Sequence, residues 1–140
     1  MKGYKWVFAD MSGRRVSWGV GKSPLEVTYS TKEYAEAPDL AAKHGYFLTF
    51  FDTEEHARSF LESPYPCEEL WEVDAQDIMR EFPPQVMGIA HVAPQRISAF
   101  LENEKKISPP YSNWPPGTLM AKRIKLVRRL WPPEDETASD

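Results

Sequence analysis

One stretch, residues 45–74, constrains the fold of this chain more than any other, because a bulky apolar run, a helix start and a proline stop follow one another there. Residues 46–51 hold five bulky side chains and one polar residue, Thr49, which is typical of a strand buried on both faces. Asp52 is followed three residues later by Glu55, a spacing related to the capping box. The run therefore predicts a strand that leads directly into a helix.

The predicted helix covers residues 53–63, and the prolines at 64 and 66 exclude its continuation. Its first turn carries negative charge, which the helix dipole favours. Three apolar residues share one face, which we expect to pack on the preceding strand: Ala57, Phe60 and Leu61. Residues 69–74 then alternate as in a second strand. If the two strands pair in parallel, the crossover between them should be right-handed.

Further strands and a second main helix are predicted along the rest of the chain. Residues 3–9 and 14–20 flank a glycine-containing turn, which predicts a hairpin, and residues 119–131 predict a long closing strand. Apolar residues at 97, 100 and 101, followed by two lysines, predict a helix over 97–106. The remaining predictions are a short strand at 25–29, a loop with one short helix at 31–44, a helical turn at 75–82, a strand at 85–92 and an irregular segment at 109–117.

Together these elements predict an α+β fold: a twisted, mainly antiparallel sheet of roughly five to seven strands, with the helices 53–63 and 97–106 packed on it. The length of 140 residues and the hydrophobic content of 41% suit one globular domain over residues 1–133, followed by a flexible acidic tail at 134–140.

The single cysteine, Cys67, excludes an internal disulfide framework. The chain shows neither a signal-peptide core near its start nor a run long enough to span a membrane, so we expect a cytoplasmic protein without membrane contact.

Charge is unevenly spread along the chain. Residues 1–32 and 105–131 are basic, whereas residues 33–104 and 132–140 are acidic. Separating these segments would leave strong fields of one sign on a small body. We therefore expect the two basic ends of the domain to lie against its acidic middle.

The residue types that carry most catalysis and metal binding are sparse. The three histidines, His44, His56 and His91, are scattered and lack the spacing of a metal motif. Cys67 lies beside two glutamates, whose charge disfavours a thiolate. We therefore expect no metal site, no cofactor and no nucleophilic cysteine.

The order of several short patterns resembles a group of small uncharacterised proteins from phage, mobile-element and environmental sequences. These patterns are an early Tyr-Lys strand, a strand that ends in Tyr29, the run Phe51-Asp52-Thr53-x-Glu55-x-Ala57-x-x-Phe60, Leu70-Trp71-Glu72-Val73, and a late Pro-Pro-Gly-Thr followed by Lys125-Leu126-Val127-Arg128-Arg129. The resemblance implies a recurrent fold and a gene carried on mobile DNA. It implies nothing about catalytic activity or ligands.

Three functions stay open at this point. The first is a non-catalytic binding or protein-interaction module, which also admits self-association. Stiff proline segments with protruding rings suit such a role, although they also occur in packed loops. Its predicted contact surface comprises the tryptophans Trp18, Trp114 and Trp131 and the basic residues Lys122, Arg123, Lys125 and Arg129.

The second function is an enzyme that resembles the ADP-ribosyltransferases, or a degenerate relative of them. In that interpretation Lys5, Tyr29 and Glu72, or Glu69 in place of Glu72, take the family's basic, aromatic and acidic roles, although lysine replaces the usual arginine or histidine. The third function is weak nucleic-acid binding through the basic strand 122–129, with bases stacked on nearby tryptophans. The net charge of −4 disfavours it.

Overall fold

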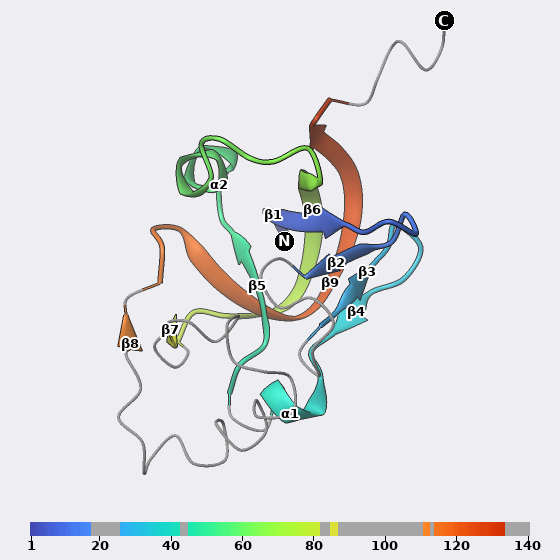
Figure 1. The fold of residues 1–140 in the computed structure, drawn as a ribbon. Coiled ribbons are helices and arrows are strands. Elements are labelled where there is room, and N and C mark those ends of the chain that lie inside the picture. Colours follow the sequence, from blue (N-terminus) through green and yellow to red (C-terminus); the bar gives the residue numbers. More distant parts are fainter. Residues whose placement is uncertain (18–25, 43–44, 82–84, 87–110, 113, 134–140) are drawn as a thin grey trace, which may run out of the picture.

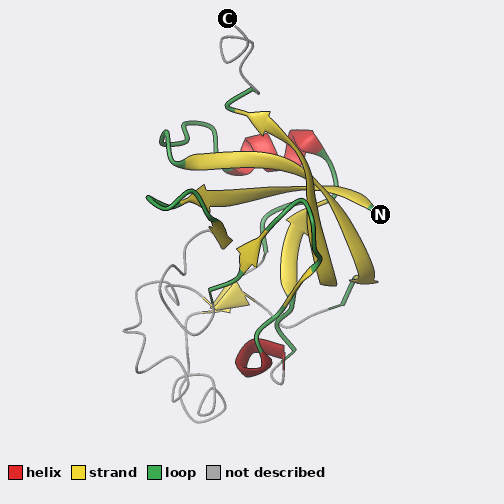
Figure 2. Ribbon diagram, turned by 90° about the vertical axis from the view of Figure 1, so that its right-hand side faces the viewer, coloured by secondary structure: helices red, strands yellow, loops and turns green. Residues whose placement is uncertain are grey.

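A computed structural model describes residues 1–17, 26–42, 45–81, 85–86, 111–112 and 114–133. This part of the chain is mainly β (Figure 1). Its strands are β1 (Lys2–Ala9), β2 (Arg15–Ser17), β3 (Thr28–Tyr29), β4 (Ala35–Glu36), β5 (Leu48–Phe51), β6 (Glu68–Met79), β7 (Gln85–Val86), β8 (Tyr111–Ser112) and β9 (Thr118–Trp131). Its helices are α1 (Asp39–Ala42) and α2 (Glu54–Phe60), which lie at opposite ends of the molecule (Figure 1, Figure 2).

Four of these strands close into a small barrel. β1 pairs antiparallel with β5 and with β6, and β9 pairs antiparallel with the same two strands. β2 and β3 extend the sheet from β1, and β4 adds to β9. The two long strands, β6 and β9, curve strongly as they cross the molecule (Figure 1). Closure leaves the four barrel strands without a free edge over their paired lengths.

The expectation of an α+β fold with two main helices is wrong. The helix predicted at 53–63 is present as α2, which has only seven residues, Glu54–Phe60. The second predicted helix, 97–106, lies outside the described residues. The two strands of the central stretch, β5 and β6, do not pair with each other, because β1 and β9 each stand between them. Helices therefore do not cover the sheet as a layer; the sheet closes on itself instead.

A second correction concerns residues 75–82, for which the sequence predicts a helical turn. Residues up to Met79 continue β6, where Ile78 faces Ala121 and Met79 faces Met120 on β9. Pairing with a distant strand has overridden the local pattern. The segment 109–117 is also less irregular than expected, because Tyr111–Ser112 pairs with Gln85–Val86.

Other predictions are confirmed. β1 and β2 form the expected hairpin, β9 is the long closing strand, and α1 is the short helix expected within 31–44. The strand predicted at 46–51 is present as Leu48–Phe51. The helix after it begins at an N-cap, Thr53, whose hydroxyl oxygen accepts a hydrogen bond from the amide of His56 at 3.1 Å.

The barrel interior is filled by alternate residues of its strands, among them Val7, Phe50, Val73 and Ile124, each at most 1% exposed. Gly3 is needed where β1 meets β5. A Cβ atom at this position would lie 2.3 Å from Cδ2 of Phe50. The absence of a side chain therefore lets the Phe50 ring lie against the backbone of β1.

A second apolar cluster lies on the outer face of the barrel, beneath α2. It is built on Trp6, Phe51, Ala57 and Leu70. The indole Nε1 of Trp6 donates a hydrogen bond of 2.7 Å to the main-chain oxygen of Ala57, which ties β1 to the helix. Trp131, at the end of β9, packs against the same cluster.

The predicted pairing of basic ends with the acidic middle is confirmed by ion pairs across β1, β2, β6 and β9. Glu72 of β6 lies 3.4 Å from the ammonium of Lys2 and 3.3 Å from Nε of Arg128. Glu69 of the same strand lies 3.1 Å from Nε of Arg15. The uneven charge of the sequence is thus compensated locally on the sheet.

Candidate functional site

The structure brings together two of the three residues of the transferase interpretation. The Nζ atom of Lys5 lies 5.1 Å from the ring centre of Tyr29. Glu72 does not join them. Lys5 is opposite Trp71 in the β1–β6 ladder and Glu72 is opposite Tyr4, and neighbouring residues of a strand point to opposite faces. The carboxylate of Glu72 instead meets Lys2 and Arg128.

Lys5 is enclosed in the protein, with 7% of its surface exposed. Its ammonium donates a hydrogen bond of 2.6 Å to the main-chain oxygen of Thr49. Burial lowers the pKa of Lys5 to about 8 and raises the pKa of Tyr29 above its usual value. No carboxylate in the described part of the chain forms an ion pair with Lys5.

Glu69, the alternative to Glu72 as the acidic residue of the transferase interpretation, is buried, and both of its carboxylate oxygens have partners in the chain. Its carboxylate accepts hydrogen bonds from Nε of Arg15 at 3.1 Å and from the indole of Trp71 at 2.9 Å. Nη1 of Arg129 lies 3.5 Å from its second oxygen. These contacts give Glu69 a structural role that joins β2, β6 and β9.

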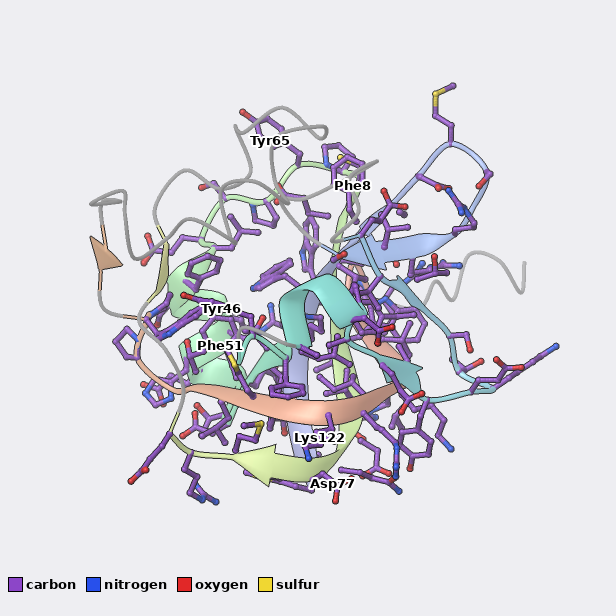
Figure 3. The ribbon with its side chains drawn as sticks, turned by 90° about the horizontal axis from the view of Figure 1, so that it is seen from below. Phe8, Tyr46, Phe51, Tyr65, Asp77 and Lys122 are labelled. Carbon is purple, nitrogen blue, oxygen red and sulfur yellow. The ribbon has the colours of Figure 1, made fainter. Side chains whose placement is uncertain are left out.

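The basic side chains of β9 are distributed among acidic and aromatic neighbours. Arg123 lies between Glu36 at 3.6 Å and Asp77 at 3.5 Å. Lys125 lies over the ring of Tyr34 at 4.9 Å and Lys122 over that of Phe47 at 5.8 Å. Figure 3 shows Lys122 and Asp77 near each other at the lower edge of the view, on the paired strands β9 and β6. The guanidinium of Arg123 is thus already matched by carboxylates of this chain.

Of the three tryptophans predicted to bind, the structure describes Trp114 and Trp131. Trp18 lies outside the described residues. Trp114 precedes β9, a strand of fourteen residues, and Trp131 is its last residue, so the two tryptophans lie at opposite ends of the strand. Of the predicted binding residues, Trp131 is the one that lines a described pocket.

That pocket, which we name the Trp131 pocket, opens between the carboxyl end of α2 and the end of β9. Its volume is about 240 Å³. The ring centres of Trp6 and Trp131 are 6.2 Å apart, with their planes inclined at 60°. Six residues line it: Trp6, Arg58, Leu61, Glu62, Pro64 and Trp131.

Part of this pocket could be anticipated from the sequence. The alternation of β1 places Trp6 on the face that α2 covers, and Leu61 belongs to the predicted apolar face of the helix. Arg58, Glu62 and Pro64 were not predicted as site residues. They reach Trp131 because α2 packs on β1 next to the end of β9, a long-range arrangement without a local pattern.

A second polar arrangement lies at the amino end of α2. Nδ1 of His56 is 2.6 Å from Oδ1 of Asp52, a contact across one helical turn that the i, i+4 spacing would have suggested. The pair lies against Gly117, whose main-chain oxygen accepts a hydrogen bond of 2.9 Å from the amide of Asp52. A Cβ atom at Gly117 would lie 2.3 Å from Nδ1 of His56. The pair therefore connects α2 to the turn before β9.

The described residues contain no group of three or more histidine, cysteine, aspartate or glutamate side chains that could hold a metal ion. None of the helices described is long and apolar enough to cross a membrane. No protein-family model, curated protein or solved structure matches the chain.

Proposed function

We propose that this protein is a non-catalytic interaction module that binds a partner protein through the Trp131 pocket. The observation that carries the proposal is the pairing of two indoles, Trp6 and Trp131, at a pocket between α2 and the end of β9. Tryptophan is among the residues most enriched where binding energy concentrates at protein interfaces.

The size of the pocket supports a side-chain ligand over a free cofactor. Small-molecule sites usually span about 300–1,000 Å³, whereas the Trp131 pocket has a volume of about 240 Å³. One protruding side chain of a partner fits a space of this size. A dinucleotide, such as the substrate of an ADP-ribosyltransferase, is too large for this pocket.

The walls of the pocket are held in place before any partner arrives. Trp6 is 4% exposed and its indole is bonded to Ala57 of α2. Leu61 and Trp131 both pack on the cluster that contains Trp6. A fixed wall lowers the entropic cost of binding.

The other two functions have less support. The separation of Glu72 from Lys5 and Tyr29, and the engagement of Glu69 with Arg15 and Arg129, weaken the case for the transferase interpretation. Ion pairing of Arg123, Arg128 and Arg129 with carboxylates of this chain weakens the case for phosphate binding. The resemblance to phage and mobile-element proteins and the cytoplasmic setting stay predictions.

Selection from a displayed library of random peptides tests this function. We expect the folded protein to enrich peptides that compete with one another for one site. Replacement of Trp131 by alanine should abolish their binding. Val127→Ala is the matched control, because Val127 is an apolar residue of the same strand that is 45% exposed and does not line the pocket. Selected peptides that bind the Trp131→Ala variant with the same affinity as they bind the parent protein would contradict the proposal.

A further inference from the structure

We propose that the Trp131 pocket recognises a cationic side chain, lysine or arginine, presented by a basic segment of the partner. This inference rests on the proposed function and specifies the chemistry of the ligand. Its basis is the balance of charge at the pocket, together with the two aromatic walls.

The charged residues of the pocket are not equivalent. Nε of Arg58 lies 2.7 Å from Oε2 of Glu54, one helical turn away, so its charge is compensated within α2. Glu62, which also lines the pocket, has no ion pair or hydrogen bond to any other described residue. The pocket and its immediate neighbour Glu54 therefore carry a net negative charge.

The helix dipole acts in the same direction. The pocket lies at the carboxyl end of α2, where the dipole favours positive charge. This raises the affinity of the pocket for a cation and lowers it for an anion.

Because Trp6 is almost fully buried, the partly exposed indole of Trp131 supplies the remaining interaction. A lysine ammonium or an arginine guanidinium over the face of a tryptophan gains about 0.5–1 kcal/mol at exposed sites. The methylene stem of either side chain can lie along Leu61 and Pro64, which are apolar. A long cationic side chain thus satisfies both the apolar walls and the unpaired carboxylate of Glu62.

A titration with three capped pentapeptides tests the inference on the full chain. The peptides carry lysine, norleucine or glutamate between pairs of glycines, and norleucine is the neutral counterpart of lysine. Binding is followed by the nuclear magnetic resonance signal of the Trp131 indole, assigned with Trp131→Phe, up to millimolar peptide. We expect the lysine peptide to bind about 2- to 5-fold more tightly than the norleucine peptide. That preference should disappear in Glu62→Gln and at high salt, and the glutamate peptide should bind most weakly.

Each outcome decides between the two proposals. If norleucine binds as tightly as lysine, the cationic ligand is ruled out and the interaction module stands. The same holds if Glu62→Gln keeps the preference for lysine. If none of the peptides moves the Trp131 signal and the displayed library yields no ligand, both proposals fail. Glu55→Gln on the same helix is the control, because Glu55 does not line the pocket.

Discussion

The ammonium nitrogen of Lys5 lies 2.6 Å from the main-chain oxygen of Thr49, inside a barrel where no described carboxylate pairs with it. The contact bridges β1 and β5, which share a single paired position, Tyr4 with Phe51. One hydrogen bond and the ring of Tyr29 replace the hydration shell of the charge. Burial without an opposite charge destabilises the charged form.

Replacing Lys5 with methionine should therefore stabilise the protein at neutral pH. The pKa of Lys5 is about 8 in the folded state against 10.5 for an ordinary lysine, and this difference corresponds to roughly 3 kcal/mol. Because the side chain also loses a hydrogen bond, we expect a net gain of about 1–3 kcal/mol. Urea unfolding at pH 7, followed by tryptophan fluorescence, measures it.

The pH dependence of stability gives a second readout of Lys5. As pH rises through about 8 the folded state loses a proton that the unfolded state keeps, so stability should rise until pH 10. Above pH 10 the raised pKa of Tyr29 reverses the trend, because the unfolded tyrosine ionises first. The rise should be absent in Lys5→Met and present in the control Lys2→Met, whose side chain is 62% exposed. A flat profile in the parent protein would contradict this account of Lys5.

Gly117 should not tolerate a side chain. It has a φ of +84°, and a Cβ atom there would lie 2.3 Å from Nδ1 of His56. Gly13 has a similar φ of +86° with open space around it. We expect Gly13→Ala to cost about 1 kcal/mol from backbone strain alone and Gly117→Ala about 1–2 kcal/mol more. The difference between the two variants in thermal unfolding measures the contact with the Asp52–His56 pair. Equal losses of stability would show that this pair moves aside at no energetic cost.

Glu69 should contribute more to stability than an exposed acid. It is buried and holds Arg15 and Arg129, and replacement by glutamine leaves these guanidinium groups without their carboxylate. We expect Glu69→Gln to cost about 3 kcal/mol. The control Glu54→Gln, which breaks the exposed pair with Arg58, should cost less than about 1 kcal/mol. Similar costs in urea unfolding would contradict a central role for Glu69.

The elements that the sequence predicted well are those with local patterns. The hairpin β1–β2 follows from alternation around a tight turn, and β9 follows from a long alternating run after Gly117. The helix start was predicted to within one residue, because the capping-box spacing pointed to Asp52 and the structure has Thr53 as the N-cap. The pairing of opposite charges followed from their uneven spread along the chain.

The elements that escaped prediction depend on distant contacts. Residues 75–79 have no strand pattern of their own and become strand because β9 pairs with them. Closure of the barrel requires β5 and β6 each to join β1 with β9, and hydrophobic periodicity does not encode strand order. The Trp131 pocket likewise draws its walls from β1, α2 and β9, so the sequence indicated Trp131 without its neighbours.

The most direct measurement of the central claim is the calorimetric affinity of one selected peptide for the parent protein, Trp131→Ala and Val127→Ala. Truncation of a central interface tryptophan typically costs at least about 2 kcal/mol, or roughly 30-fold in affinity. We therefore predict at least such a loss in Trp131→Ala and no change in Val127→Ala, with both variants still folded by circular dichroism. Equal affinity for all three proteins would place the binding surface elsewhere and contradict the proposed role of the Trp131 pocket.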